Sequence, residues 1–257
     1  MKRSRLPLLV TIAVLFFFYL PIIILVVNSF NASRFGTGWQ GFSMRWYARL
    51  LHEPEIWRAA RNSLIIALGA TALSVVFGTT AAFALHRFAR SRLQRFHYGL
   101  VYTPLVVPEI LMGISLLMAF AAAGVRLGLG TIFLAHVTFC VSFVAMTVLA
   151  RLQDFDFAVI EAAQDLGAGW GTTLRKVLLP LIAPGILAGA LLAFTLSIDD
   201  FVITFFVAGP GSTTLPIRIY SMIKYGSPPL INALSTILLT VTFTAVAASQ
   251  RISRSKG

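Results

Sequence analysis

Two adjacent acids, Asp199 and Asp200, stand inside a long apolar run of the sequence. A carboxylate in hydrocarbon is costly, so such residues should face a cavity, a partner or a cationic substrate. Glu109 lies in another apolar run, and Tyr102 and Tyr220 offer aromatic faces. Because carboxylates and aromatic faces bind ammonium groups, we predict a cation pathway that includes Asp199, Asp200, Glu109 and Tyr220.

The same residues have structural alternatives. Neighbours on a helix point about 100° apart, so Asp199 and Asp200 cannot face one pore equally, and one of them would then cap a partner subunit or pair with an arginine. Glu109 directly follows Pro108 and would instead bond to backbone groups that the proline frees. For Tyr220 the alternative is anchoring at the membrane interface.

The sequence shows no motif for nucleotide binding or for a zinc site. It contains no Gly-x-x-x-x-Gly-Lys-Ser/Thr loop for nucleotide phosphates, and its histidines and single cysteine lack zinc-ligand spacing. His136 is the histidine embedded in an apolar run, where we expect packing or hydrogen bonding, and Cys140 is expected to pack as a small residue. We therefore predict a non-catalytic chain with no metal and no cofactor of its own.

The composition points to a membrane protein. Of 257 residues, 58% are hydrophobic and only 12% are charged, which is too few polar groups to cover a soluble domain. The net charge of +12 comes mainly from short cationic patches between apolar runs, as membrane topology produces, and not from a basic face typical of a nucleic-acid binder. Since lipid offers the backbone no hydrogen-bond partner, we predict an all-α integral membrane protein in the lipid bilayer, without a nucleic-acid partner.

The apolar runs predict one transmembrane domain over residues 1–257 with six spans. The expected spans are about 8–27, 63–85, 100–123, 131–150, 181–207 and 233–248. The first is expected to be retained, because no small-residue cleavage pattern follows it. Lys and Arg are more numerous in the segments on the N-terminal side of the membrane, which predicts that both termini are cytoplasmic. Pro104 and Pro108 predict kinks in the third span, and the cations and aromatics of 44–50 predict a helix at the membrane surface.

The predicted inner loop 154–180 carries a second pattern. Its stretch Phe157–Leu166 places apolar residues on one helix face and polar residues on the other, and Gly167 predicts the helix stop. A short amphipathic helix between two spans is suited to pass force from a cytosolic partner to a pore.

This loop resembles a known motif. Glu161-Ala162-Ala163, then Gly167 and Leu179-Pro180, resembles the "EAA" loop of permease subunits of bacterial binding-protein-dependent ABC importers. Four further runs are similar to the second permease of spermidine/putrescine importers, namely 197–204, 209–211, 214–221 and 231–236. Iron(III) and opine-type permeases share parts of them.

The resemblance implies a type I ABC importer permease fold in the bacterial inner membrane. It implies that a coupling helix docks on an ATPase through Glu161, Ala162, Ala163, Asp165 and Gly167. It also implies that the pore is a heterodimer with a different permease, and that two ATPase copies, which bind ATP and Mg²⁺, and a periplasmic or extracellular solute-binding protein complete the importer.

The expected function is ATP-driven import of polyamines by alternating access. The alternatives are ABC import of iron(III) or opines, a transporter driven by an ion gradient, and a polytopic membrane enzyme. A gradient-driven transporter leaves the Glu-Ala-Ala loop unexplained, and an enzyme would need a catalytic cluster that the sequence lacks.

Overall fold

A computed structural model describes residues 6–34, 38–88, 92–153, 155–156, 158–226 and 228–254. Nearly all of this chain is helical, and an isolated antiparallel bridge joins Asn31 to Phe42. The chain forms two compact units, one made of Met1–Trp57 and Arg218–Gly257 and the other of Arg58–Ile217. The all-α fold predicted from the apolar runs is confirmed.

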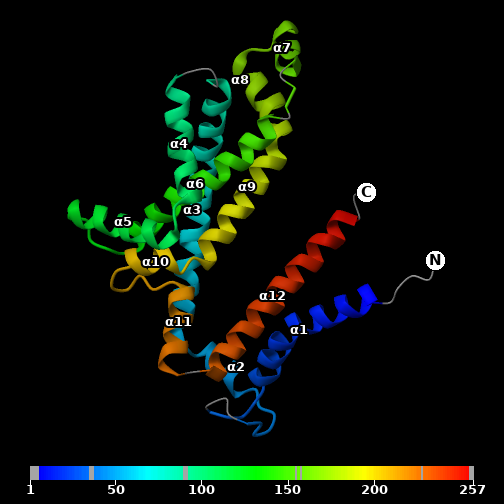
Figure 1. Cartoon of the computed structure of the whole chain (residues 1–257), viewed down its shortest axis with the longest axis vertical. Coiled ribbons are helices and arrows are strands. Elements are labelled where there is room, and N and C mark those ends of the chain that lie inside the picture. The colour runs from blue at the N-terminus through cyan, green and yellow to red at the C-terminus, as the bar shows by residue number, and fades with distance from the viewer. Residues whose placement is uncertain are drawn as a thin grey trace. The chain divides into compact units, whose positions relative to one another are not determined.

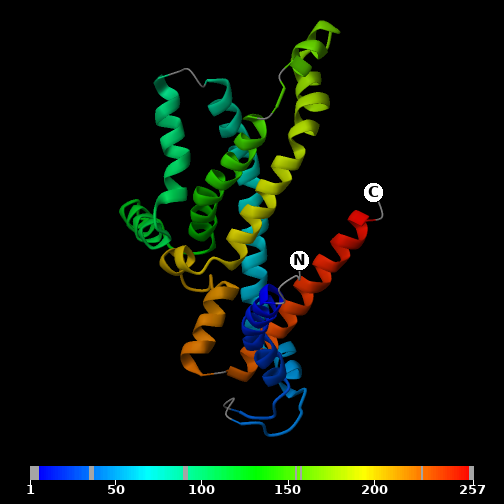
Figure 2. The ribbon, with the colours of Figure 1, turned by 45° about the vertical axis from the view of Figure 1, so that its right-hand side comes forward.

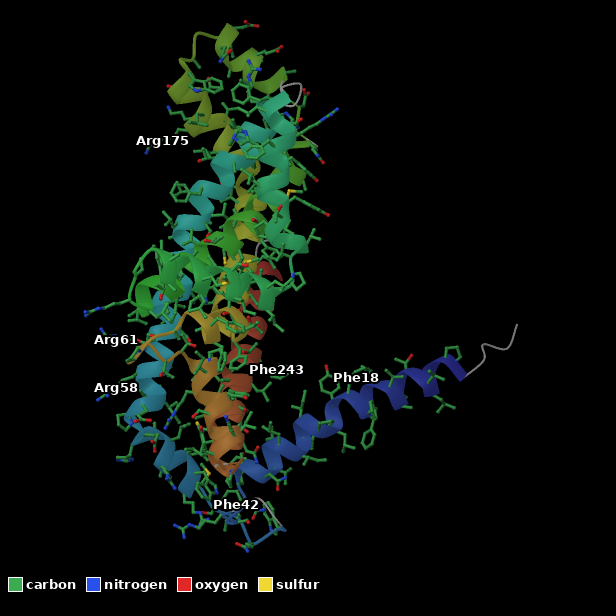
Figure 3. The ribbon with its side chains drawn as sticks, turned by 60° about the vertical axis from the view of Figure 1, so that its left-hand side comes forward. Phe18, Phe42, Arg58, Arg61, Arg175 and Phe243 are labelled. Atoms are coloured by element: carbon green, nitrogen blue, oxygen red, sulfur yellow. The ribbon has the colours of Figure 1, made fainter. Side chains whose placement is uncertain are left out.

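The first unit consists of terminal helices. Helix α1 (Leu6–Ser29) and the short α2 (Arg45–Leu51) both pack against α12 (Pro228–Arg254) (Figure 1). The side chain of Phe18 projects outward from α1 (Figure 3) and is 67% exposed. Most of α1 thus offers apolar side chains to its surroundings, as a membrane span does.

The helix predicted over 44–50 is present as α2, and its side chains have an amphipathic pattern. Its Trp46 and Leu50 are buried, whereas Arg45 and Arg49 are exposed. The indole of Trp46 donates a hydrogen bond of 2.8 Å to the carbonyl of Asn31, which ties α2 to the loop that follows α1.

The second unit is a bundle around α6 (Leu129–Gln153), which contacts α4 (Arg92–Val106) and α9 (Leu179–Asp199), while α3 (Pro54–Arg87) extends into this unit (Figure 1). The side chains of Cys140, Val144 and Val148 on α6 are fully buried in its core.

The predicted third span, 100–123, is not one straight helix. It divides into α4 and α5 (Glu109–Ala122), whose axes differ by 113°. The break falls at Pro108, which has extended backbone angles of φ −55° and ψ 135°. Proline has no N–H and disfavours the helical conformation in the residue before it, so the kink predicted at Pro108 is confirmed and is sharper than ordinary bending. Pro104 lies within α4.

The predicted fifth span, 181–207, is also divided. Helix α9 ends at Asp199, Asp200 has extended angles of φ −60° and ψ 122°, and a separate α10 runs from Val202 to Val207. The helix stops here because the side chain of Asp200 accepts backbone hydrogen bonds from Ile203 and Thr204, a local pattern that competes with a continuous helix.

Among the described residues, four helices are long and apolar enough to cross a membrane, and five are if the bent pair of α4 and α5 counts as one span. Helix α12 contains a shorter apolar stretch, Pro229–Thr244. The predicted spans 8–27, 63–85 and 131–150 fall within α1, α3 and α6, respectively.

Candidate functional sites: an acidic cavity and a protruding helix

A cavity of about 370 Å³ opens in the second unit where both broken helices meet α6. It lies beside the α4–α5 break and the α9–α10 break. Its lining consists of Pro104, Leu105, Val107, Glu109, Met112, Phe139, Phe143, Leu196, Asp199, Asp200, Phe201, Val202 and Ile203. The three acids singled out in the sequence therefore line one cavity.

Asp199 is placed where a negative charge is disfavoured. It is the last residue of α9 and is exposed, and the C-terminal end of a helix carries partial negative charge. Glu109 instead occupies the first turn of α5, where the helix dipole favours an acid. Neither forms an ion pair within the described part of the chain, so Asp199 in particular presents a carboxylate suited to a cation.

Asp200 differs from its neighbour because its carboxylate is already occupied. Its Oδ2 accepts hydrogen bonds from the backbone N–H of Thr204 at 2.8 Å and from the Thr204 hydroxyl at 2.6 Å, and its Oδ1 accepts a longer bond of 3.3 Å from the N–H of Ile203. The same Oδ2 lies 3.3 Å from Nε2 of His136. The side chain is only 6% exposed. Asp200 thus caps the start of α10.

The aromatic residues of the cavity are phenylalanines. Phe139 and Phe143 come from α6, and Phe201 comes from the α9–α10 break. The spacing of four residues between Phe139 and Phe143 puts them on one helix face, which is a signal present in the sequence. Tyr220 lies on α11 (Leu215–Tyr225), in its part that belongs to the first unit, and is not among the lining residues.

A short helix, α7 (Ala158–Asp165), stands at the end of the second unit beyond the N-terminal end of α9 (Figure 2). It has an amphipathic pattern, with Ile160 buried and Glu161 and Asp165 exposed. The predicted helix from Phe157 to Leu166 is therefore present over Ala158–Asp165. Phe157 itself and Asp154, with which the predicted loop begins, lie outside the described residues.

Gly167 ends α7 as the sequence predicts. Its φ is +84°, its N–H bonds to the carbonyl of Gln164 at 2.8 Å, and the N–H of Ala168 bonds to the carbonyl of Ala163 at 3.0 Å. This pair of bonds is a Schellman motif, which requires the left-handed conformation that glycine adopts without steric cost. Leu166, next to it, is 89% exposed.

After the turn at Gly167, a continuous helical segment leads from Trp170 into the bundle. It consists of α8 (Trp170–Thr173), a π-helical turn η1 (Leu174–Leu178) and α9. Arg175 lies in η1 and its side chain points outward (Figure 3). The helical segment is uninterrupted from Trp170 to Asp199.

Apolar helices around a cavity that holds three acids, with a short helix that protrudes between two of them, are the pattern of a membrane transport subunit. A family model described as "Binding-protein-dependent transport system inner membrane component" matches residues 74–254, and the chain belongs to this family.

Curated relatives agree with this assignment, and a solved structure has the same fold. The chain is 46% identical over 244 residues to the "Spermidine/putrescine transport system permease protein PotC" of Escherichia coli (strain K12), covering 95% of this chain and 92% of that protein. It is 44% identical over 229 residues to the "Putrescine transport system permease protein PotI" of the same strain, covering 87% and 82%. A chain of a bacterial ABC transporter involved in alginate import has the same fold, with a TM-score of 0.76, 17% identity and 98% coverage of both chains.

The chain is therefore the permease of an ABC importer, as the Glu-Ala-Ala loop indicated, and it is a multi-pass inner membrane protein. It is not catalytic, because a separate ATPase handles ATP in such systems. Its system also includes a binding protein and a partner permease. The family assignment excludes the gradient-driven transporter and the membrane enzyme.

Proposed function

We propose that this chain forms half of the translocation pore of a polyamine importer. The observation that carries the proposal is the cavity with Asp199 and Glu109 in its lining and phenylalanine faces beside them. Carboxylates and aromatic rings bind ammonium groups, and the polyamines named for the relatives are chains of such groups. The acids thus provide a reason, independent of the relatives' names, for a cationic substrate.

The phenylalanines match the rest of such a substrate. A polyamine alternates ammonium groups with apolar methylene segments. Phe139, Phe143 and Phe201 offer rings that contact both kinds of group, and the cavity volume of about 370 Å³ lies within the usual range of small-molecule sites. Because Asp200 is engaged by His136 and Thr204, Asp199 and Glu109 are the carboxylates available to the substrate.

The second part of the proposal assigns α7 to the ATPase contact. Glu161, Ala162, Ala163, Asp165 and Gly167 occupy this helix and its C-terminal stop. Beside them Leu166 is 89% exposed and Trp170 is 61% exposed. Large apolar side chains that are exposed in an aqueous loop indicate a surface that a protein partner covers. We assign both to the surface that docks on the ATPase.

The proposed topology and assembly follow from the same assignment. Both termini and α7 lie in the cytoplasm, and the Asp199 end of α9 lies toward the outside. A different permease completes the pore as a heterodimer, two ATPase copies bind ATP and Mg²⁺, and the solute-binding protein delivers the substrate from outside. Closure of the ATPase dimer moves α7, and the continuous segment through α8 and η1 transmits the movement to α9.

The proposal is tested by ATP hydrolysis in the reconstituted importer with its binding protein. Rates are compared without ligand and with putrescine, spermidine or iron(III), for the wild type, Glu161→Gln and Glu161→Lys. Stimulation by a polyamine that Glu161→Lys abolishes and Glu161→Gln partly retains supports both parts of the proposal. Stimulation by iron(III) alone overturns the polyamine assignment, and full stimulation in Glu161→Lys overturns the role of Glu161.

A further inference from the structure

A buried histidine behind the acidic cavity connects three helices. His136 of α6 is 1% exposed, and both of its ring nitrogens have partners. Nδ1 lies 2.7 Å from the hydroxyl of Ser197 on α9, and Nε2 lies 2.9 Å from the hydroxyl of Thr204 on α10. Nε2 also lies 3.3 Å from Oδ2 of Asp200, which stands between these two helices. His136 thus holds the break at which α9 ends and α10 begins.

The hydrogen-bond donors and acceptors of this network determine that Nε2 of His136 carries a proton. An ionised carboxylate only accepts, so the hydroxyl of Thr204 uses its proton in the 2.6 Å bond to Asp200. The oxygen of Thr204 must then accept from Nε2 of His136, which therefore carries a proton. With Nε2 carrying a proton, the neutral imidazole has a bare Nδ1, to which the hydroxyl of Ser197 donates.

The network separates the roles of two adjacent acids. The carboxylate of Asp200 is directed toward His136 and Thr204, whereas Asp199 is exposed and has no ion-pair partner in the described ranges. Since the bonds of Asp200 to Ile203 and Thr204 define the backbone at the break, they also define the direction in which the preceding residue points. The position of Asp199 therefore depends on what holds Asp200.

We infer that His136 is a positioning residue, which binds Asp200 at the start of α10 and thereby presents Asp199 to the cavity. The inference deepens the proposed function and rests on it, because it identifies what orients the carboxylate offered to the substrate. Removal of one partner from a buried hydrogen bond leaves the other partner unsatisfied. Without the imidazole, Asp200 would turn toward the cavity, and the break would lose its geometry.

The test uses the complete importer with three substitutions of His136. In His136→Gln the side-chain amide reaches the place of Nε2 and keeps a donor for Asp200 and Thr204. In His136→Asn the shorter amide lies near the place of Nδ1 and does not reach them, and His136→Leu removes both polar atoms. The first readout is the apparent KM and kcat of polyamine-stimulated ATP hydrolysis.

A second readout reports the position of residue 199 without substrate. Asp199→Cys is combined with each variant of His136, and its reaction rate with a positively charged methanethiosulfonate reagent is measured in membranes. The natural Cys140 is fully buried and gives a low background. Because a hydrogen bond to the carboxylate of Asp200 is lost, we expect His136→Leu and His136→Asn to raise the apparent KM roughly tenfold or more and to change the labelling rate. In His136→Gln we expect the apparent KM and the labelling rate to stay near the wild-type values.

The outcomes separate the inference from the proposed function. Equal values for His136→Gln and His136→Leu, or an unchanged labelling rate in His136→Leu, would overturn the positioning role. If His136→Leu fails to assemble, the comparison of Gln with Asn decides, and equal values for these two overturn the role. If polyamines do not stimulate the wild-type importer, the proposed function fails, yet the labelling rates still decide whether His136 positions residue 199.

Discussion

Gly78 of α3 packs so closely against Val144 of α6 that a Cβ atom on the glycine would lie 2.7 Å from the Cβ of Val144. The carbonyl oxygen of Val141 would be 2.9 Å away. Val144 also faces α9, where a Cβ atom on Gly189 would lie 3.3 Å from the Cα of Val144. Contacts of this kind are typical of membrane helices, which associate through close packing of small residues.

We expect Gly78→Ala to destabilise the second unit by about 1–3 kcal/mol, because the added methyl group overpacks the contact between α3 and α6. Val144→Ala should not relieve the strain, since its own Cβ and the carbonyl of Val141 remain. Thermal unfolding of the purified importer in detergent measures the effect. The matched control is Gly99→Ala on α4, where an added Cβ meets no atom within 4 Å, and an equal loss in this control would contradict the packing argument.

Gly167→Ala should weaken coupling to the ATPase by disturbing the end of α7. A Cβ at this position meets no atom within 4 Å, but the φ of +84° is strained for any L-residue. The left-handed conformation costs roughly 1–2 kcal/mol, and we expect lower substrate-stimulated ATP hydrolysis with unchanged amounts of permease. Gly171→Ala, also in open space and without positive φ, is the control. Gly167→Asn should retain more activity than Gly167→Ala, because asparagine tolerates this conformation.

Leu166→Ser tests the docking surface separately from folding. Because its side chain is 89% exposed, we expect the free energy of unfolding of the isolated permease pair to stay within about 0.5 kcal/mol of the wild-type value. Thermal unfolding measures it. Affinity for the ATPase, measured by co-purification or titration, should fall roughly tenfold, as when an apolar side chain leaves an interface. Leu178→Ser, at a residue that is 2% exposed, should instead reduce stability. Wild-type ATPase affinity in Leu166→Ser would argue against this surface.

The sequence predicted the helices well because long apolar runs leave few alternatives in lipid. It did not predict where they break. Pro108 is a local signal, and the kink there was foreseen, but its 113° size depends on how α5 packs against α10 and α6. The break at Asp200 has no proline or glycine to mark it and arises from side-chain bonds to α10 and to His136.

The same limit applies to the candidate site. Its acids were identified from the cost of a carboxylate in hydrocarbon, which needs no tertiary information. Their different roles depend on His136, which is more than sixty positions away in sequence and is brought beside Asp200 by packing of α6 against α9 and α10. Phe139 and Phe143 could not be chosen from the sequence, because residue type alone does not reveal which helix face borders the cavity. The place of Tyr220 in the substrate pathway stays a prediction.

Asp199→Asn and Asp200→Asn should therefore have different effects, although the two residues are adjacent. Asp199→Asn removes a negative charge from the C-terminal end of α9, where it is disfavoured, so stability should be unchanged or higher by up to about 1 kcal/mol. The polyamine concentration that gives half-maximal uptake should rise roughly tenfold, because a charge-assisted contact is lost.

Asp200→Asn loses an acceptor that binds Thr204 and His136 and should cost roughly 1.5–3 kcal/mol of stability. Thermal unfolding and uptake, measured on the same preparations, separate the two. Wild-type uptake in Asp199→Asn would remove this residue from the substrate pathway, and full stability in Asp200→Asn would show that the network with His136 does not hold the break between α9 and α10.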